Sequence, residues 1–199
     1  MPNSKKPRHK KKKTAHTALT KYNGLAKIRN MALILDKGHV LNQCIKIMFE
    51  FEQLINDDIV EPIWFNKIIT MLVTGKVLAQ QLPLTVDCQK QALESIEEAA
   101  YMLFTSMRIK TKQQPIPPAN VDIVRSGLST AQELFKYAQD NNGDAFLQAI
   151  YASMGKETDT IEDHMKRHQY LMGDRWETVL KWVNDGEIVF TWDKEDTEE

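Results

Sequence analysis

The most regular segment of the chain is 85-TVDCQKQALESIEEAAYMLFTSMRIK-110. Its apolar residues recur at intervals of three and four, which places them on one face of an α-helix. These residues are Ala92, Leu93, Ile96, Ala99, Ala100, Leu103, Phe104 and Met107. Basic residues at Arg108 and Lys110 suit a helix C-terminus, because positive charge offsets the helix dipole there. We therefore predict a helix over 85–110.

Helical spacing of apolar residues continues on both sides of this segment. It occurs in the segments 25–35, 40–55, 64–78, 121–138 and 146–151. Each is predicted to be a helix, because strands would show an alternation of apolar and polar residues instead. The segment 40–55 carries a wide apolar stripe that includes Leu41, Ile45 and Phe51.

The boundaries between these helices coincide with proline and Asn-Gly signals. The segment 111-TKQQPIPPAN-120 holds three prolines and is predicted to be a linker, with Asn120 capping the helix that follows. Asn141-Asn142-Gly143 is predicted to end that helix. The sequence thus predicts a mainly α fold with a bundle of about six helices over residues 19–154.

The composition changes after Gly155, where the chain becomes rich in charge. Thr160 and Asp163 have the spacing of a capping box, which predicts the start of a helix. Asn184-Asp185-Gly186 is a turn signal, and the residues from Ile188 to Trp192 favour a strand. We predict an acidic α/β appendage over 155–193, a helix followed by a short strand or a hairpin, and an acidic tail over 194–199.

Three of the four tryptophans of the chain lie in this appendage, at Trp176, Trp182 and Trp192. Tryptophan side chains bury a large apolar area, so they could pack the appendage on the bundle. Tryptophan is also enriched at binding hot spots. The three residues are therefore candidates for a partner-binding surface, and the sequence leaves both roles open.

The N-terminal segment is strongly basic. Residues 1–30 hold ten basic residues and no acidic one, whereas the other 169 residues hold 16 basic and 27 acidic residues, a net charge of −11. We predict a disordered tail over residues 1–18, because so dense a positive charge cannot be buried. Seven of its cations form one run: Lys5, Lys6, Arg8, Lys10, Lys11, Lys12 and Lys13.

This basic run has three possible roles. Contacts between its cations and phosphates would bind DNA or RNA without sequence preference, through the release of counterions. Alternatively, the run is a solubilising tail or docks on the acidic part of the same chain. A membrane-surface role has little support, since no amphipathic face or lipidation motif accompanies the run, and we expect no membrane partner.

No pattern for catalysis stands out. His164 and His168 share a helical face and are weak candidates for metal ligands, but a zinc site needs three or four ligands. We therefore expect an exposed charged face there and no metal. The glycines are scattered singly, without a phosphate-binding loop, and no serine lies in a nucleophile motif. We expect a non-enzymatic protein without a cofactor, a metal-dependent hydrolase being the least supported alternative.

The predicted location is the cytoplasm. No apolar run approaches the length of a membrane span, and no apolar signal-peptide core follows the basic residues. Neither Cys44 nor Cys88 lies in a C-x-x-C motif, and both are expected to be buried thiols in a reducing compartment.

The run Lys5-Lys6-Pro7-Arg8-His9-Lys10 to Lys13, followed by a compact helical region over about 25–154, resembles small uncharacterised helical proteins of phages and other mobile elements. The resemblance implies a bacterial or phage cytosol, a regulatory or host-interacting role and no catalytic residues. The sequence as a whole predicts a nucleic-acid-associated accessory or regulatory protein. The alternative is a protein-interaction module, such as an inhibitor or adaptor acting on a host complex, that uses the acidic C-terminal unit.

Overall fold

The computed structural model describes residues 36–56, 62–153 and 160–188. Backbone contacts divide the chain into two units, Met1–Val40 and Leu41–Glu199. In the first unit, the Asp36 carboxylate accepts hydrogen bonds from the N–H groups of Gly38 and His39, at 2.9 and 3.2 Å. These bonds cap the N-terminus of helix α2, which spans Lys37–Asn56.

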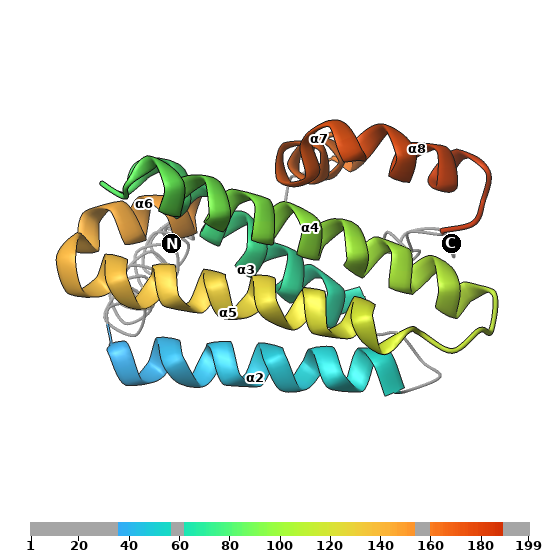
Figure 1. Cartoon of the computed structure of the whole chain (residues 1–199), viewed down its shortest axis with the longest axis horizontal. Helices are drawn as coiled ribbons and strands as arrows, with labels where there is room; N and C mark the ends of the chain where they lie inside the picture. Colours follow the sequence, from blue (N-terminus) through green and yellow to red (C-terminus); the bar gives the residue numbers. More distant parts are fainter. Residues whose placement is uncertain (1–35, 57–61, 154–159, 189–199) are drawn as a thin grey trace, which may run out of the picture. The chain divides into compact units, whose positions relative to one another are not determined.

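Three long helices form the centre of the second unit. They are α3 (Pro62–Gln81), α4 (Val86–Thr111) and α5 (Pro118–Asn141), and they pack side by side (Figure 1). The shorter α6 (Gly143–Ser153) lies against α3 and α5. Their apolar stripes meet in a core whose largest fully buried members include Leu72, Leu78, Ile96, Leu103, Phe104, Leu128 and Phe146.

Two glycines let α5 approach its neighbours closely. A Cβ atom on Gly127 of α5 would lie 2.9 Å from the backbone oxygen of Ser95 in α4, and closer still to the Cβ of Ala99. A Cβ atom on Gly75 of α3 would lie 2.7 Å from the Cβ of Ala131 in α5. Both distances are shorter than real Cβ contacts, so the spacing of the three helices depends on the absence of these side chains.

The helix boundaries follow from local sequence signals. Thr85 caps α4 by accepting a hydrogen bond from the N–H of Cys88, and the predicted helix over 85–110 is confirmed. The prediction that Asn120 caps the next helix is wrong, because α5 already begins at Pro118. Proline is favoured at the first helical position, where its missing N–H costs nothing.

The C-terminal part of the unit is also helical. It consists of α7 (Ile161–Met172), a 3-10 turn η1 (Gly173–Arg175) and α8 (Trp176–Asn184). Helices α7 and α8 both contact α4 (Figure 1), and α7 also contacts α3. The capping box predicted at the start of α7 is present, with Thr160 and Asp163 each accepting a hydrogen bond from the other's backbone N–H.

The predicted turn after α8 is present, and Gly186 adopts a φ of +70°, which glycine tolerates best. No strand occurs in residues 36–56, 62–153 and 160–188. The strand or hairpin predicted from Ile188 to Trp192 lies outside the described residues, apart from Ile188. The prediction of a mainly helical fold is confirmed for the described part of the chain, where α2 to α6 fall within the predicted bundle.

None of the helices in the described ranges is both long enough and apolar enough to cross a lipid bilayer.

Candidate functional site

The candidate nucleic-acid-binding residues, Lys5 to Lys13, lie outside the described residues, as does Trp192. The remaining candidates are His164, His168, Trp176 and Trp182, and all four belong to α7 or α8. The contacts that hold these two helices against the bundle therefore decide what their side chains can do.

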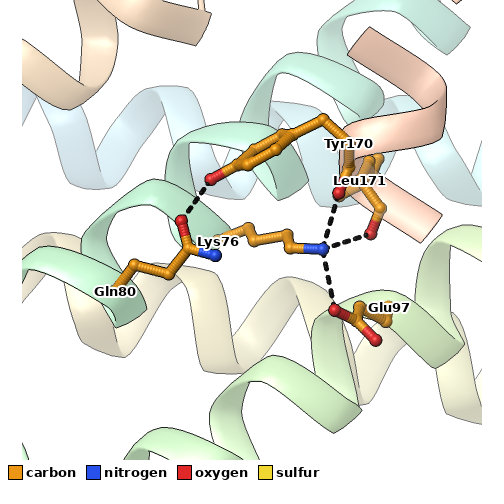
Figure 2. A network of polar contacts seen from close by, with 5 residues as sticks. All are labelled: Lys76, Gln80, Glu97, Tyr170 and Leu171. Atoms are coloured by element: carbon orange, nitrogen blue, oxygen red, sulfur yellow. Dashed lines mark hydrogen bonds and ion pairs between the residues drawn. The ribbon is translucent and has the colours of Figure 1, made fainter. Parts of the chain in front are cut away.

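A buried lysine of α3 fixes the end of α7. The Nζ atom of Lys76 donates hydrogen bonds to the backbone oxygens of Tyr170 and Leu171, at 2.6 and 3.3 Å, and to Oε1 of Glu97 in α4, at 2.7 Å (Figure 2). The Tyr170 hydroxyl donates to Oε1 of Gln80, one turn further along α3, at 2.6 Å. One ammonium thus connects α3, α4 and α7.

This arrangement satisfies two needs at once. The last carbonyls of a helix have no partner within the helix and carry the negative end of its dipole. The Lys76 ammonium supplies both the hydrogen-bond donors and the positive charge. Its three N–H groups are shared among Glu97, Tyr170 and Leu171, so the group acts as a structural tie between helices.

Comparable ties hold α2. Lys110 of α4 donates a hydrogen bond to the backbone oxygen of Leu54, in the last turn of α2. The Nε and Nη2 atoms of Arg125 donate to the two carboxylate oxygens of Glu52, at 2.7 and 2.8 Å. These contacts connect α2 to α4 and α5 through polar groups.

His168 lies inside an aromatic cluster, and the prediction that this face of α7 is exposed is wrong for it. Its side chain is 2% exposed. Its ring centroid lies 5.2 Å from that of Phe104 in α4, 5.8 Å from that of Trp176 and 6.5 Å from that of Phe65 in α3. Burial lowers the pKa of His168 to about 3, and the nearby charges of His164 and Arg167 act in the same direction.

The described part of the chain brings no metal-ligand set together around His164 and His168. In the residues that the structure describes, no three His, Cys, Asp or Glu side chains come close enough together to hold a metal ion. His164 is partly exposed, whereas His168 points into the aromatic cluster.

The two described tryptophans have different environments. Trp176 is buried against His168 and Phe104, which is the packing role that the sequence left open. Trp182 is half-buried, and its ring lies between α8 and α4, with the Arg108 guanidinium 4.6 Å from its centroid.

Glu187 completes the contact of this end with α4. Its carboxylate accepts hydrogen bonds from Nε of Arg108 and from Nζ of Lys112, the latter at 2.9 Å. These two bonds lower the pKa of Glu187 to about 2. The carboxylate therefore stays ionised at mildly acidic pH, and the contact between the turn after α8 and the end of α4 persists there.

The two cysteines also differ. Cys44 is buried, and burial raises the pKa of its thiol to about 11. Cys88 lies exposed in the first turn of α4, so the expectation that both thiols are buried is wrong for Cys88.

Sequence reasoning did not single out one further surface. Leu41, Ile45 and Phe49 form an exposed apolar stripe on α2, with exposed fractions of 49%, 54% and 61%. The three residues follow each other at intervals of four, so they lie on one helical face. Exposed apolar patches often mark interaction sites. The sequence did hold a signal for this stripe. The apolar residues of 40–55 cover a wider part of the helix surface than one buried face requires.

We expect Phe49→Ala to change the free energy of unfolding by less than about 0.5 kcal/mol, because the side chain has few contacts to lose. The milder substitution Phe51→Leu, two residues further on, should destabilise by about 1 kcal/mol because Phe51 is 1% exposed. Urea unfolding followed by circular dichroism measures both. A larger loss for Phe49→Ala than for Phe51→Leu would contradict the orientation of α2.

No protein-family model, curated protein or solved structure matches this chain.

Proposed function

We propose that this chain is a non-enzymatic, nucleic-acid-associated accessory or regulatory protein whose N-terminal arm contacts the phosphate backbone. The observation that carries the proposal is the charge of residues 1–30, which hold ten basic residues and no acidic one. Seven of these cations fall within the nine residues from Lys5 to Lys13, a density typical of segments that bind nucleic acid.

The chemistry of the arm defines the kind of binding. Lysine is a point charge that pairs with phosphate without reading base edges, and six of the seven cations are lysines. Tyr22 is the only aromatic residue near the run, so the arm lacks the repeated aromatic side chains on which single-stranded bases stack. Binding by the arm is therefore electrostatic, independent of base sequence and sensitive to salt. Both DNA and RNA are ligands of the kind that such an arm binds.

The helical body supports a scaffold role beside such an arm. Its buried charged groups connect helices: Lys76 bonds to the end of α7, and the Glu50 carboxylate accepts a hydrogen bond from Lys67 at 2.7 Å. A general acid must donate a proton to the substrate, and a general base must accept one from it. The buried ammonium of Lys76 is instead committed to three protein oxygens.

Deleting residues 1–13 should weaken nucleic-acid binding at low salt by at least about tenfold, because the counterion release that drives binding is lost. Fluorescence anisotropy with a labelled 30-base-pair DNA duplex and a labelled single-stranded RNA measures the affinity. Circular dichroism checks that the helical content of the truncated protein is retained.

A matched control removes charge from the body instead of the arm. Lys90 is largely exposed, with a side-chain exposure of 73%, and Lys90→Gln should leave the affinity unchanged. Equal affinity of the intact and the truncated protein would rule out the arm as the binding element.

A further inference from the structure

We propose that the exposed stripe on α2 is the contact surface of a homodimer, in which the α2 helices of two copies pack antiparallel. The stripe consists of Leu41, Ile45 and Phe49, which all belong to the second unit. The proposal is independent of nucleic-acid binding.

The three side chains of the stripe present one continuous apolar surface. Successive members differ by about 40° around the helix axis, so all three fall within about 80°. Their exposed fractions rise from 49% for Leu41 to 61% for Phe49. Water is released when such a surface meets another apolar surface, and this favours association.

The charge of the chain favours a second copy as the occupant of this surface. Residues 31–199 hold 16 basic and 27 acidic residues, so the bodies of two copies repel each other. From Leu41 to Phe49, however, the sequence holds one charged residue, Lys46. Depletion of charge around an apolar centre is typical of the core of a protein–protein interface.

The next acidic residues of α2 are held by cations of the same chain. Glu50 is buried and accepts a hydrogen bond from Lys67 at 2.7 Å. Glu52 accepts two hydrogen bonds from Arg125. Two acidic bodies can therefore meet at the stripe without bringing unpaired carboxylates of α2 together.

Other kinds of occupant fit this surface less well. A phosphate backbone or an anionic membrane would find a single cation between Leu41 and Phe49. A cationic partner would be attracted to the acidic residues elsewhere on the body instead.

The stripe also matches itself under two-fold rotation, as the interface of a symmetric dimer requires. A two-fold axis through Ile45 places Leu41 of each copy opposite Phe49 of the other, and the two Ile45 side chains opposite each other. Lys46 lies about 100° from Ile45 around the helix. The same rotation therefore places the two Lys46 side chains on opposite sides of the contact, where they do not face each other.

The size of the stripe sets the strength of the dimer. Three half-exposed side chains over two helical turns bury less than the roughly 800 Å² per copy of a standard stable interface. We therefore expect a reversible dimer with a dissociation constant above about 1 μM.

Sedimentation equilibrium of the full chain, from about 5 to about 500 μM protein, tests the proposal. The average mass should rise from that of one copy towards that of two. In Ile45→Glu the dissociation constant should increase at least about tenfold, because two carboxylates meet at the two-fold axis. Phe49→Ala keeps the net charge and should also increase it by about tenfold, because each dimer loses two phenyl rings.

Val86→Glu is the matched control for Ile45→Glu. Val86 is 80% exposed in the first turn of α4, where a negative charge suits the helix dipole. This variant adds the same charge to another exposed apolar residue and should dimerise as the unmodified protein does. Circular dichroism checks that the helical content of all variants is retained.

The salt dependence distinguishes this dimer from one held by the basic arm. Salt screens the repulsion between the two bodies, so association should be at least as strong at about 0.5 M salt as at about 0.15 M. Three results would overturn the proposal: a single copy at every concentration, an unchanged dissociation constant in both stripe variants, or a dimer that weakens as salt rises. The last is the behaviour of ion pairs between the arm of one copy and the acidic body of another.

Discussion

Replacing Gly127 with leucine is expected to lower the free energy of unfolding by about 4 kcal/mol, since it forces α4 and α5 apart. A Cβ atom at this position would already meet the backbone oxygen of Ser95 at 2.9 Å and the side chain of Ala99 closer still. Backbone atoms cannot rotate away as a flexible side chain can. The whole helix pair must therefore shift, and the contacts of the core residues between the two helices are lost.

Urea unfolding followed by far-ultraviolet circular dichroism measures this effect. Gly143→Ala is a suitable control, because a Cβ atom on Gly143 would have no neighbour within 4 Å. Alanine has the higher helix propensity, so this variant should be as stable as the unmodified protein or more so by up to about 1 kcal/mol. A Gly127→Leu protein with unchanged stability would refute the close approach of α4 and α5.

The second large effect is expected for Lys76→Met, which should destabilise the protein by about 3 kcal/mol. Methionine keeps much of the apolar stem but removes the ammonium, so the carbonyls of Tyr170 and Leu171 and the Glu97 carboxylate lose their shared donor. The side chain of Glu97 is 32% exposed, so water can replace part of its lost interaction. The expected loss of unfolding free energy therefore lies at the lower end of the range of about 3–5 kcal/mol for removing one partner of a buried ion pair.

Lys90→Met is the matched control for Lys76→Met. Lys90 lies on the exposed surface of α4, with its Nζ 3.8 Å from Oε1 of Glu94. An exposed pair of this kind contributes little, so the control should lose less than about 0.5 kcal/mol. Equal losses for the two variants in thermal unfolding would show that Lys76 does not hold α7.

Local signals made much of the secondary structure predictable from the sequence. The capping box at Thr160 predicted the start of α7, and the regular apolar spacing of 85–110 predicted α4 almost to the residue. Both signals act within one or two helical turns, so they do not depend on the rest of the fold.

The roles of individual polar residues were not predictable in this way. Lys76 is a typical surface residue by composition, and its burial depends on two carbonyls that lie 94 and 95 positions further along the chain. The environment of His168 likewise requires rings from α3, α4 and α8. Tertiary contacts of this kind leave no periodic trace in the sequence.

The exposed stripe on α2 illustrates a second limit of prediction from sequence. Apolar spacing placed Leu41, Ile45 and Phe51 in one wide stripe, but only Phe51 is buried. Leu41 and Ile45 lie about 80° and about 120° from Phe51 around the helix axis, so a wide stripe serves both a buried face and an exposed one. The sequence pattern alone does not say which part faces the core.

We expect the basic arm to bind nucleic acid, and the salt dependence of binding tests this expectation. The logarithm of the association constant for a DNA duplex should fall linearly as the logarithm of the salt concentration rises. Seven cations that each contact a phosphate give a slope no steeper than about −6. Replacing Lys10, Lys11, Lys12 and Lys13 with glutamine should reduce this slope by about 3.6. An unchanged slope and affinity in that variant would contradict the claim.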